Sequence, residues 1–157
     1  MPLLLLFLLF SCTAWSQNDN LKYPLQKLML ETSAGFNSTR AGIKKIENGD
    51  TIFYSNFFLE GTYDAEIEKS AANKENWIFT CTIDSSNVKG ARKSVEKWRK
   101  KLRPVLGKEF QLKKIEEPFG ARGFLFTDNR VRIMIFQVII KQKGAFSKAY
   151  IIIGKEE

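Results

Sequence analysis

The chain has 157 residues, of which 44% are hydrophobic and 27% are charged. This balance is typical of a folded domain and excludes a wholly disordered chain. Histidine is absent, which removes the most common general base near neutral pH and the most common metal ligand, and no cofactor is expected. The formal net charge is +8, and most of this excess falls between residues 89 and 103.

Residues 1–16 are typical of a signal peptide that directs export. The apolar run Leu3–Phe10 is too short to cross a bilayer as a helix, so no transmembrane span is expected. Ala14 and Ser16 supply the small residues that a signal peptidase requires. This spacing predicts cleavage after Ser16, which leaves one domain over residues 17–157.

A lipid anchor is the alternative for the same segment. Residues 9–12 can be interpreted as a lipoprotein box in which Cys12 becomes the acylated first residue. Both alternatives place the protein outside the cytoplasm, as a periplasmic or secreted protein.

One helix and three strands are predicted next along the chain. Apolar residues at helical spacing predict the first helix over residues 21–40, with Gly35 as a point where it could end. Residues 42–49 are expected to form a turn-rich connector. Runs of β-branched and aromatic residues then predict strands over residues 50–59, 62–67 and 76–84.

The third of these strands contains Cys81. It alternates with Trp77, Phe79 and Ile83, so its side chain is expected on an apolar, buried face. No neighbouring residue is identified as a base that would lower the pKa of the thiol. We therefore interpret Cys81 as a buried hydrophobic residue and not as a nucleophile.

The second helix is predicted over residues 88–103, because apolar side chains recur there at steps of three and four. One of residues 85–87 is expected to cap its N-terminus. Pro104 is expected to end or bend the helix, and Gly107 to close the segment. A further strand is predicted over residues 108–115.

Three strands separated by short turns are predicted at the C-terminal end, over residues 123–127, 130–140 and 145–153. In the middle strand both alternating sets of side chains are apolar: Val131, Ile133, Ile135 and Ile139 on one face, and Met134, Phe136, Val138 and Ile140 on the other. A strand that is apolar on both faces needs cover on both faces. Residues 130–140 are therefore expected to be the central strand.

Together these elements predict one α+β domain. Its mainly antiparallel sheet is expected to have about six to seven strands, with two helices, in the order α-β-β-β-α-β-β-β-β. Two helices of moderate length give little cover for such a sheet. The sheet could curl on itself, the helices could cover opposite faces, or one apolar face could bind a ligand or a partner.

Two stretches, Asn56–Ala65 and Val95–Leu102, resemble small exported bacterial α+β proteins of unknown function. The shared feature is the layout of a helix, three strands, a second helix and further strands over most of residues 21–153. The resemblance implies this fold class and an exported location. It implies no activity and no site residues.

The second helix carries an unusual charge. Among residues 89–103 there are eight basic residues and one acid, Glu96. Like charges four residues apart destabilise a helix slightly, so selection for stability alone would favour more glutamates. The segment either attracts a polyanion or an anionic membrane surface, or it is a solvated face that aids solubility. The candidate binding residues are Lys89, Arg92, Lys93, Lys97, Arg99, Lys100, Lys101 and Arg103.

Three function classes follow from the sequence. The first is an exported, non-enzymatic module that binds another exported protein through its sheet. The second is a binder of anionic surfaces or polyanions through helix 88–103. The third is an enzyme that works without histidine, for which the sequence indicates no catalytic residue. Nucleic acid is not expected as a partner of an exported protein, and the sequence does not predict the oligomeric state.

Overall fold

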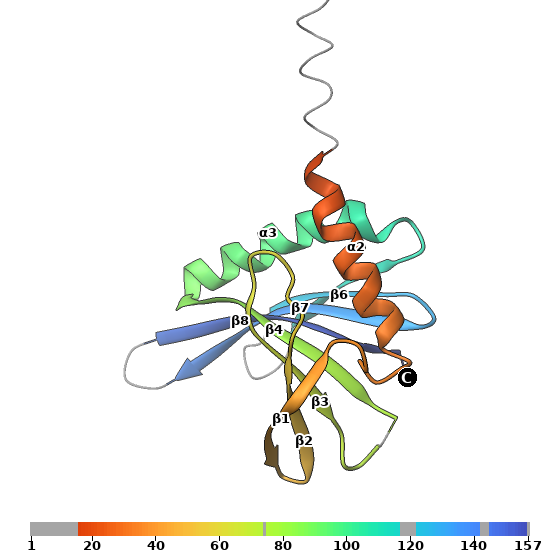
Figure 1. Ribbon diagram of the computed structural model, residues 1–157. Helices are drawn as coiled ribbons and strands as arrows, with labels where there is room; N and C mark the ends of the chain where they lie inside the picture. Colours follow the sequence, from red (N-terminus) through yellow and green to blue (C-terminus); the bar gives the residue numbers. More distant parts are fainter. Residues whose placement is uncertain (1–15, 74, 117–121, 142–144, 157) are drawn as a thin grey trace, which may run out of the picture.

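Two helices and eight strands form within the part of the chain that the computed structural model describes, which is residues 16–73, 75–116, 122–141 and 145–156. The elements in chain order are α2 (Ser16–Glu31), β1 (Arg40–Glu47), β2 (Asp50–Ser55), β3 (Tyr63–Lys69), β4 (Trp77–Asn87), α3 (Val88–Leu106), β5 (Gln111–Glu116), β6 (Arg122–Thr127), β7 (Val131–Lys141) and β8 (Ala145–Lys155). The α+β class is confirmed (Figure 1).

All eight strands belong to one antiparallel sheet with the order β1-β2-β3-β4-β8-β7-β6-β5. Each helix precedes a meander of four strands, α2 before β1–β4 and α3 before β5–β8. The last strands of the two meanders, β4 and β8, pair with each other in the middle of the sheet. The first strands, β1 and β5, form its two edges.

The expected strand number was too low, because residues 42–49 are not a connector. They belong to β1 and to a tight hairpin whose turn residues, Asn48 and Gly49, have φ angles of 53° and 90°. Two consecutive positive φ angles match the twist of a two-residue hairpin, for which Asn-Gly is a strong signal. Because β1 is an edge strand with nearly every residue exposed, it lacks the apolar alternation that marks a buried strand.

The first helix ends at Glu31 and not near residue 40. The backbone turns at Gly35 and Phe36, whose φ angles are 65° and 56°, and the N–H groups of Ala34 and Phe36 both donate to the carbonyl oxygen of Glu31 at 3.0 Å. This left-handed turn terminates the helix in the way that glycine favours. A Cβ atom on Gly35 would lie 2.9 Å from Cε2 of Trp77, so the position also requires the smallest residue.

The second helix passes through Pro104 and ends at Leu106. Proline removes one helical hydrogen bond, and here only two residues follow it before Gly107, with φ at 80°, closes the segment as expected. At the other end Asn87 is the cap: its Oδ1 accepts a hydrogen bond of 2.9 Å from the N–H of Gly90.

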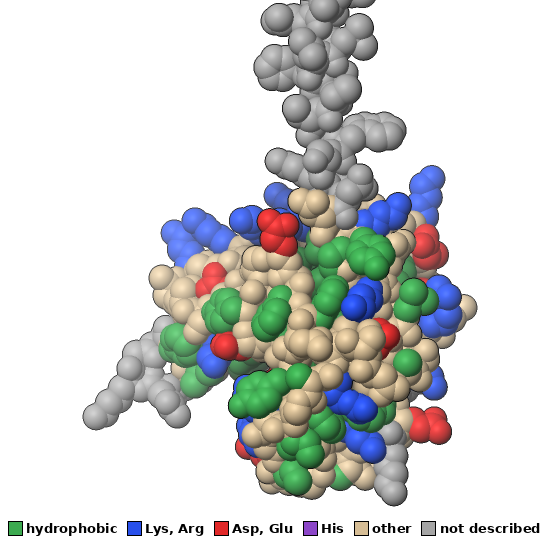
Figure 2. All heavy atoms as spheres, viewed as in Figure 1, with side chains coloured by type: hydrophobic (Ala, Val, Ile, Leu, Met, Phe, Trp, Pro, Cys, Tyr) green, Lys and Arg blue, Asp and Glu red, His purple; other side chains and the backbone are tan. Residues whose placement is uncertain are grey.

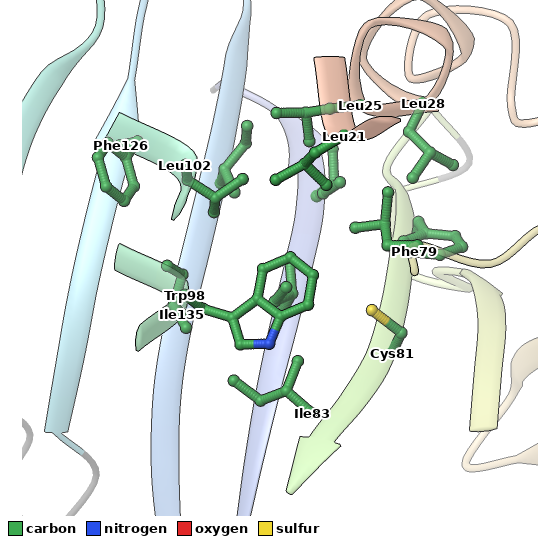
Figure 3. Packing of buried hydrophobic residues seen from close by; sticks show 14 of the residues in the cluster. Leu21, Leu25, Leu28, Phe79, Cys81, Ile83, Trp98, Leu102, Phe126 and Ile135 are labelled. Carbon is green, nitrogen blue, oxygen red and sulfur yellow. The ribbon is translucent and has the colours of Figure 1, made fainter. Parts of the chain in front are cut away.

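Both helices pack on the same face of the sheet. In Figure 3, Leu21, Leu25 and Leu28 of α2 and Trp98 and Leu102 of α3 point toward side chains of the sheet. The sheet side of this buried cluster includes Ile67, Phe79, Cys81, Phe126, Ile133, Ile135, Ile151 and Ile153, all 0% exposed. We call this side of the sheet the helix face. The hydrophobic core lies between it and the two helices.

The helix face also contains two buried polar residues, Gln137 and Ser147, near the start of α3. The Nε2 atom of Gln137 donates to the carbonyl oxygen of Val88 at 2.8 Å and to Oγ of Ser147 at 2.9 Å. These bonds satisfy the buried amide and join β7 to the start of α3 and to β8.

Residues 130–140 were expected to be the central strand, but β4 and β8 occupy the middle of the sheet and β7 is the interior strand next to β8. Only one face of β7 lies under the helices. On the other face Met134, Phe136, Val138 and Ile140 are partly exposed. The sequence predicted that both faces of this strand would be covered, but no described helix covers the second face.

Several sequence predictions concern segments outside the described residues. The signal peptide, apart from Ser16, and the acylation site Cys12 are among them. Within the described residues no helix is long and apolar enough to cross a membrane.

Candidate functional site

The side of the sheet opposite the helices has an apolar centre. Antiparallel register places Thr80, Ile152, Met134 and Leu125 side by side across β4, β8, β7 and β6. The next row on one side contains Tyr150 and Phe136, and the next row on the other side contains Ile78 of β4, opposite Gly154. We call these residues the open face: Ile78, Thr80, Leu125, Met134, Phe136, Tyr150 and Ile152, all partly exposed.

The contrast between the two faces is sharp within single strands. On β8, Ile151 and Ile153 are 0% exposed on the helix face, and Ile152 between them is partly exposed on the open face. On β7, Ile133 and Ile135 flank Met134 in the same way. Since side chains alternate along a strand, the difference comes from the helices, which cover only one side.

Aromatic packing shapes one part of the open face. The rings of Phe136 and Tyr150 lie 5.7 Å apart between centroids and are tilted by 35°. Gly123 is the partner of Phe136 on β6, and a Cβ atom there would lie 2.7 Å from Cβ of Phe136. The missing side chain of Gly123 therefore leaves room for the close approach of the β7 backbone at Ile135 and Phe136.

Charged residues border the open face on the β3 side. Burial raises the pKa of Glu68, and the nearby carboxylates of Asp50, Glu66 and Glu47 raise it further. Burial also raises the pKa of Tyr150, with smaller contributions from Glu66 and Tyr63. An acidic border therefore lies close to the apolar centre. An apolar centre with a polar rim is the usual anatomy of a protein interface.

The two edges of the sheet are less suited to binding than its face. β1 has irregular pairing with β2 and carries Lys44 and Lys45. β5 carries Lys113 and Lys114, both exposed. Irregularities and lysines on an edge strand discourage the addition of another strand.

The eight candidate residues of the second helix lie together on α3, and Figure 2 shows Lys and Arg side chains gathered over this helix. Three of them make contacts within the protein. Arg99 pairs with Glu96 at 2.9 Å and lies over the ring of Phe124, Lys101 lies over the ring of Trp98, and Arg103 donates to the carbonyl oxygen of Phe110 at 2.9 Å. We therefore infer that Arg99, Lys101 and Arg103 contribute to the stability of the fold.

The other five cations of α3 are exposed, and none of them has an acidic partner among the described ion pairs. They are Lys89, Arg92, Lys93, Lys97 and Lys100. The first turn of α3 contains no acid, so the positive end of the helix dipole adds to the potential near Lys89 and Arg92. The arrangement is compatible with both interpretations of the basic helix, a solvated face and a surface for anions.

Cys81 is buried, as the sequence predicted. Its side chain is 0% exposed, and burial raises the pKa of the thiol to about 12, although hydrogen bonds with Thr62 and Ile151 oppose this effect. Such a thiol carries almost no thiolate at neutral pH and is a poor nucleophile. Within the described ranges no cluster of three or more acidic or cysteine side chains is arranged to hold a metal ion.

No protein-family model, curated protein or solved structure matches this chain. The resemblance to small exported bacterial proteins therefore stays a prediction.

The sequence left open whether a sheet face would lack cover, and it did not predict which residues form that face. Its candidate binding residues all lie on α3, and it missed Ile78, Thr80, Tyr150 and Ile152. The run Tyr150–Ile153 is uniformly apolar, which indicated two apolar faces for β8 as well. Which of the two faces would be open depends on where both helices pack, and local periodicity carries no information about that.

Proposed function

We propose that this protein is a non-enzymatic interaction module that acts outside the cytoplasm and binds a protein partner through the open face. The observation that carries this proposal is the packing of both helices on one side of the sheet, with the apolar row Ile152, Met134 and Leu125 on the other side. An apolar sheet face is stable in water when a partner covers it.

Two further observations support a protein as the partner. The open face has a broad apolar centre, whereas small-molecule sites are concave. The acidic residues Glu66 and Glu68 border this centre on the β3 side, where they can select a partner by charge.

The experiment compares partners recovered with three forms of the exported protein. Met134→Lys introduces a charge into the open face, and Lys93→Glu changes a charge on α3 as the control. Partners are recovered at low and near-physiological salt and quantified by mass spectrometry. The proposal expects a protein that is lost with Met134→Lys, kept with Lys93→Glu and retained in salt. A partner set unchanged by Met134→Lys contradicts it.

A second candidate function rests on the five exposed cations of α3, which have no acidic partner among the described ion pairs. In this alternative the protein binds an anionic membrane surface or a soluble polyanion through the helix. A triple variant, in which Lys93, Lys97 and Lys100 are changed to Glu, removes positive charge from this surface.

The test of this alternative uses anionic vesicles and a polyanion at low and near-physiological salt. Binding that salt weakens and that the triple variant lacks would support the helix as the working surface. Absence of binding by the wild-type protein would leave α3 as a solvated face.

A further inference from the structure

A hollow lies on the helix side of the sheet, beyond the end of α2, and the open face does not contribute to it. Its volume is about 720 Å³. The turn at residues 33–37 forms one wall. The rest of the lining comes from Glu75, between β3 and β4, and from single residues of five strands: Arg40 of β1, Phe53 of β2, Lys69 of β3, Trp77 of β4 and Lys155 of β8. Small-molecule sites commonly have this size.

The charge of this hollow is strongly unbalanced. Arg40, Lys69 and Lys155 line it, and Glu75 is the one acid among its lining residues. None of the three cations forms an ion pair with a described acid. Three positive charges around one cavity repel each other, and an anion bound between them would offset this repulsion.

Aromatic rings hold two of these cations in place. The guanidinium of Arg40 lies 4.7 Å from the ring centroid of Trp77 and 5.0 Å from that of Phe53. Nζ of Lys69 lies 5.3 Å from the ring centroid of Trp77. Cation–π contacts of this kind fix the positions of the charges. Arg40 is further oriented because it donates to Oδ1 of Asn37 at 2.9 Å.

The rings themselves are fixed by packing. Phe53 and Trp77 lie 5.9 Å apart between centroids, and Gly35 brings the α2 turn into close contact with the indole. Two of the three charged groups, those of Arg40 and Lys69, therefore lie against packed rings before any ligand arrives. A preorganised site of this kind loses little entropy on binding.

We propose that this hollow is a binding site for a small molecule that carries several anionic oxygens, either as phosphate groups or as two or more carboxylates. Arg40 supplies a planar donor group that suits carboxylate and phosphate oxygens, and Lys69 and Lys155 supply two further charges. This site is independent of the open face, because its residues project from the other side of the sheet or lie beyond α2.

Isothermal titration calorimetry of the folded protein at low ionic strength tests this proposal, with pyrophosphate and citrate as probes. We expect saturable binding of at least one probe, and the comparison of the two distinguishes phosphate from carboxylate chemistry. Lys69→Gln and Lys155→Gln are each expected to weaken binding about tenfold, as the loss of one charge-assisted hydrogen bond implies.

The matched control is Lys97→Gln, which removes the same charge from α3. It is expected to leave the affinity within about twofold of the wild-type value, since Lys97 is not among the residues that line the hollow. Two results would overturn the proposal. One is no saturable binding of either probe, and the other is an equal loss of affinity in Lys97→Gln and Lys155→Gln, which would indicate attraction by net charge alone.

Discussion

Met134 on β7 and Ile152 on β8 lie directly opposite each other near the middle of the open face. Their neighbours along the same strands, Ile133 and Ile151, are 0% exposed beneath the helices. One pair of strands therefore carries a fully buried row on one side and a partly exposed apolar row on the other. This relationship connects the packing of two helices on one face to the proposed role of the opposite face.

The two isoleucines Ile151 and Ile152 provide a direct comparison of the two faces. Ile151→Ala should lower the free energy of unfolding by about 2–5 kcal/mol, because it leaves a cavity in the core. Ile152→Ala should cost clearly less, since part of this side chain is already in contact with water. Urea denaturation of both variants measures the difference. Equal losses would mean that the open face is covered in the isolated protein.

Gly35 should not tolerate a side chain. Its φ angle of 65° is unfavourable for alanine, and the added Cβ would lie 2.9 Å from Trp77. Gly35→Ala should therefore lower the free energy of unfolding by roughly 1–3 kcal/mol. Gly42→Ala is the control, because no atom lies within 4 Å of its added Cβ. Thermal denaturation that ranks Gly42→Ala as the more harmful change would contradict the described turn.

Asp128 should contribute stability that is lost in acid. Burial alone would raise its pKa, but hydrogen bonds from the N–H groups of Arg130 and Val131, both 2.8 Å, and the charge of Arg130 lower it below its usual value. A lowered pKa stabilises the folded state above the pKa of the unfolded chain, and this contribution disappears as pH falls through the folded value.

The comparison for this residue is Asp128→Asn, which keeps an oxygen acceptor and removes the charge. Wild type should be the more stable protein at about pH 6, and the difference should shrink as pH is lowered toward about 2. Chemical denaturation across this range measures it. A difference that does not depend on pH would contradict the lowered pKa.

Glu68 should behave in the opposite way. Its pKa is raised by burial first and then by Asp50, Glu66 and Glu47. The folded state therefore binds the proton more tightly than the unfolded chain, and its stability rises as pH falls through the folded pKa. Glu68→Gln should stabilise the protein at neutral pH, and this gain should vanish below about pH 4. A stabilisation that persists in acid would show that charge is not its cause.

Local pattern predicted those parts of the fold in which hydrophobic spacing is strong. The apolar seam of α3, which includes Val95, Trp98 and Leu102, gave its position within a few residues, and the strands β6–β8 were recognised from their turns. β1 was missed because an exposed edge strand lacks alternation. The end of α2 was misplaced because Gly35 and Phe36 adopt a left-handed turn inside a sequence that continues at helical spacing.

The candidate sites were harder to predict from the sequence than the fold. The exposed cations of α3 lie within one short segment of the chain, so their clustering was predicted. The contact of Arg103 with the carbonyl oxygen of Phe110 could not be predicted, because it depends on how the chain folds after the helix. The hollow around Trp77 combines residues from five strands and one turn, and no local window contains more than a few of them. Tertiary packing alone brings Arg40, Lys69 and Lys155 together.

The most direct test of the open face is a photo-crosslinking measurement in the cells that produce the protein. A benzophenone analogue of phenylalanine replaces Phe136 on the open face. In the control it replaces Phe58, an exposed aromatic residue in the segment between β2 and β3. We predict a discrete protein adduct at position 136 that is absent at position 58 and is lost when Ile152→Lys is added. A folded protein that forms no adduct at position 136, or the same adduct at both positions, would contradict the proposed role of the open face.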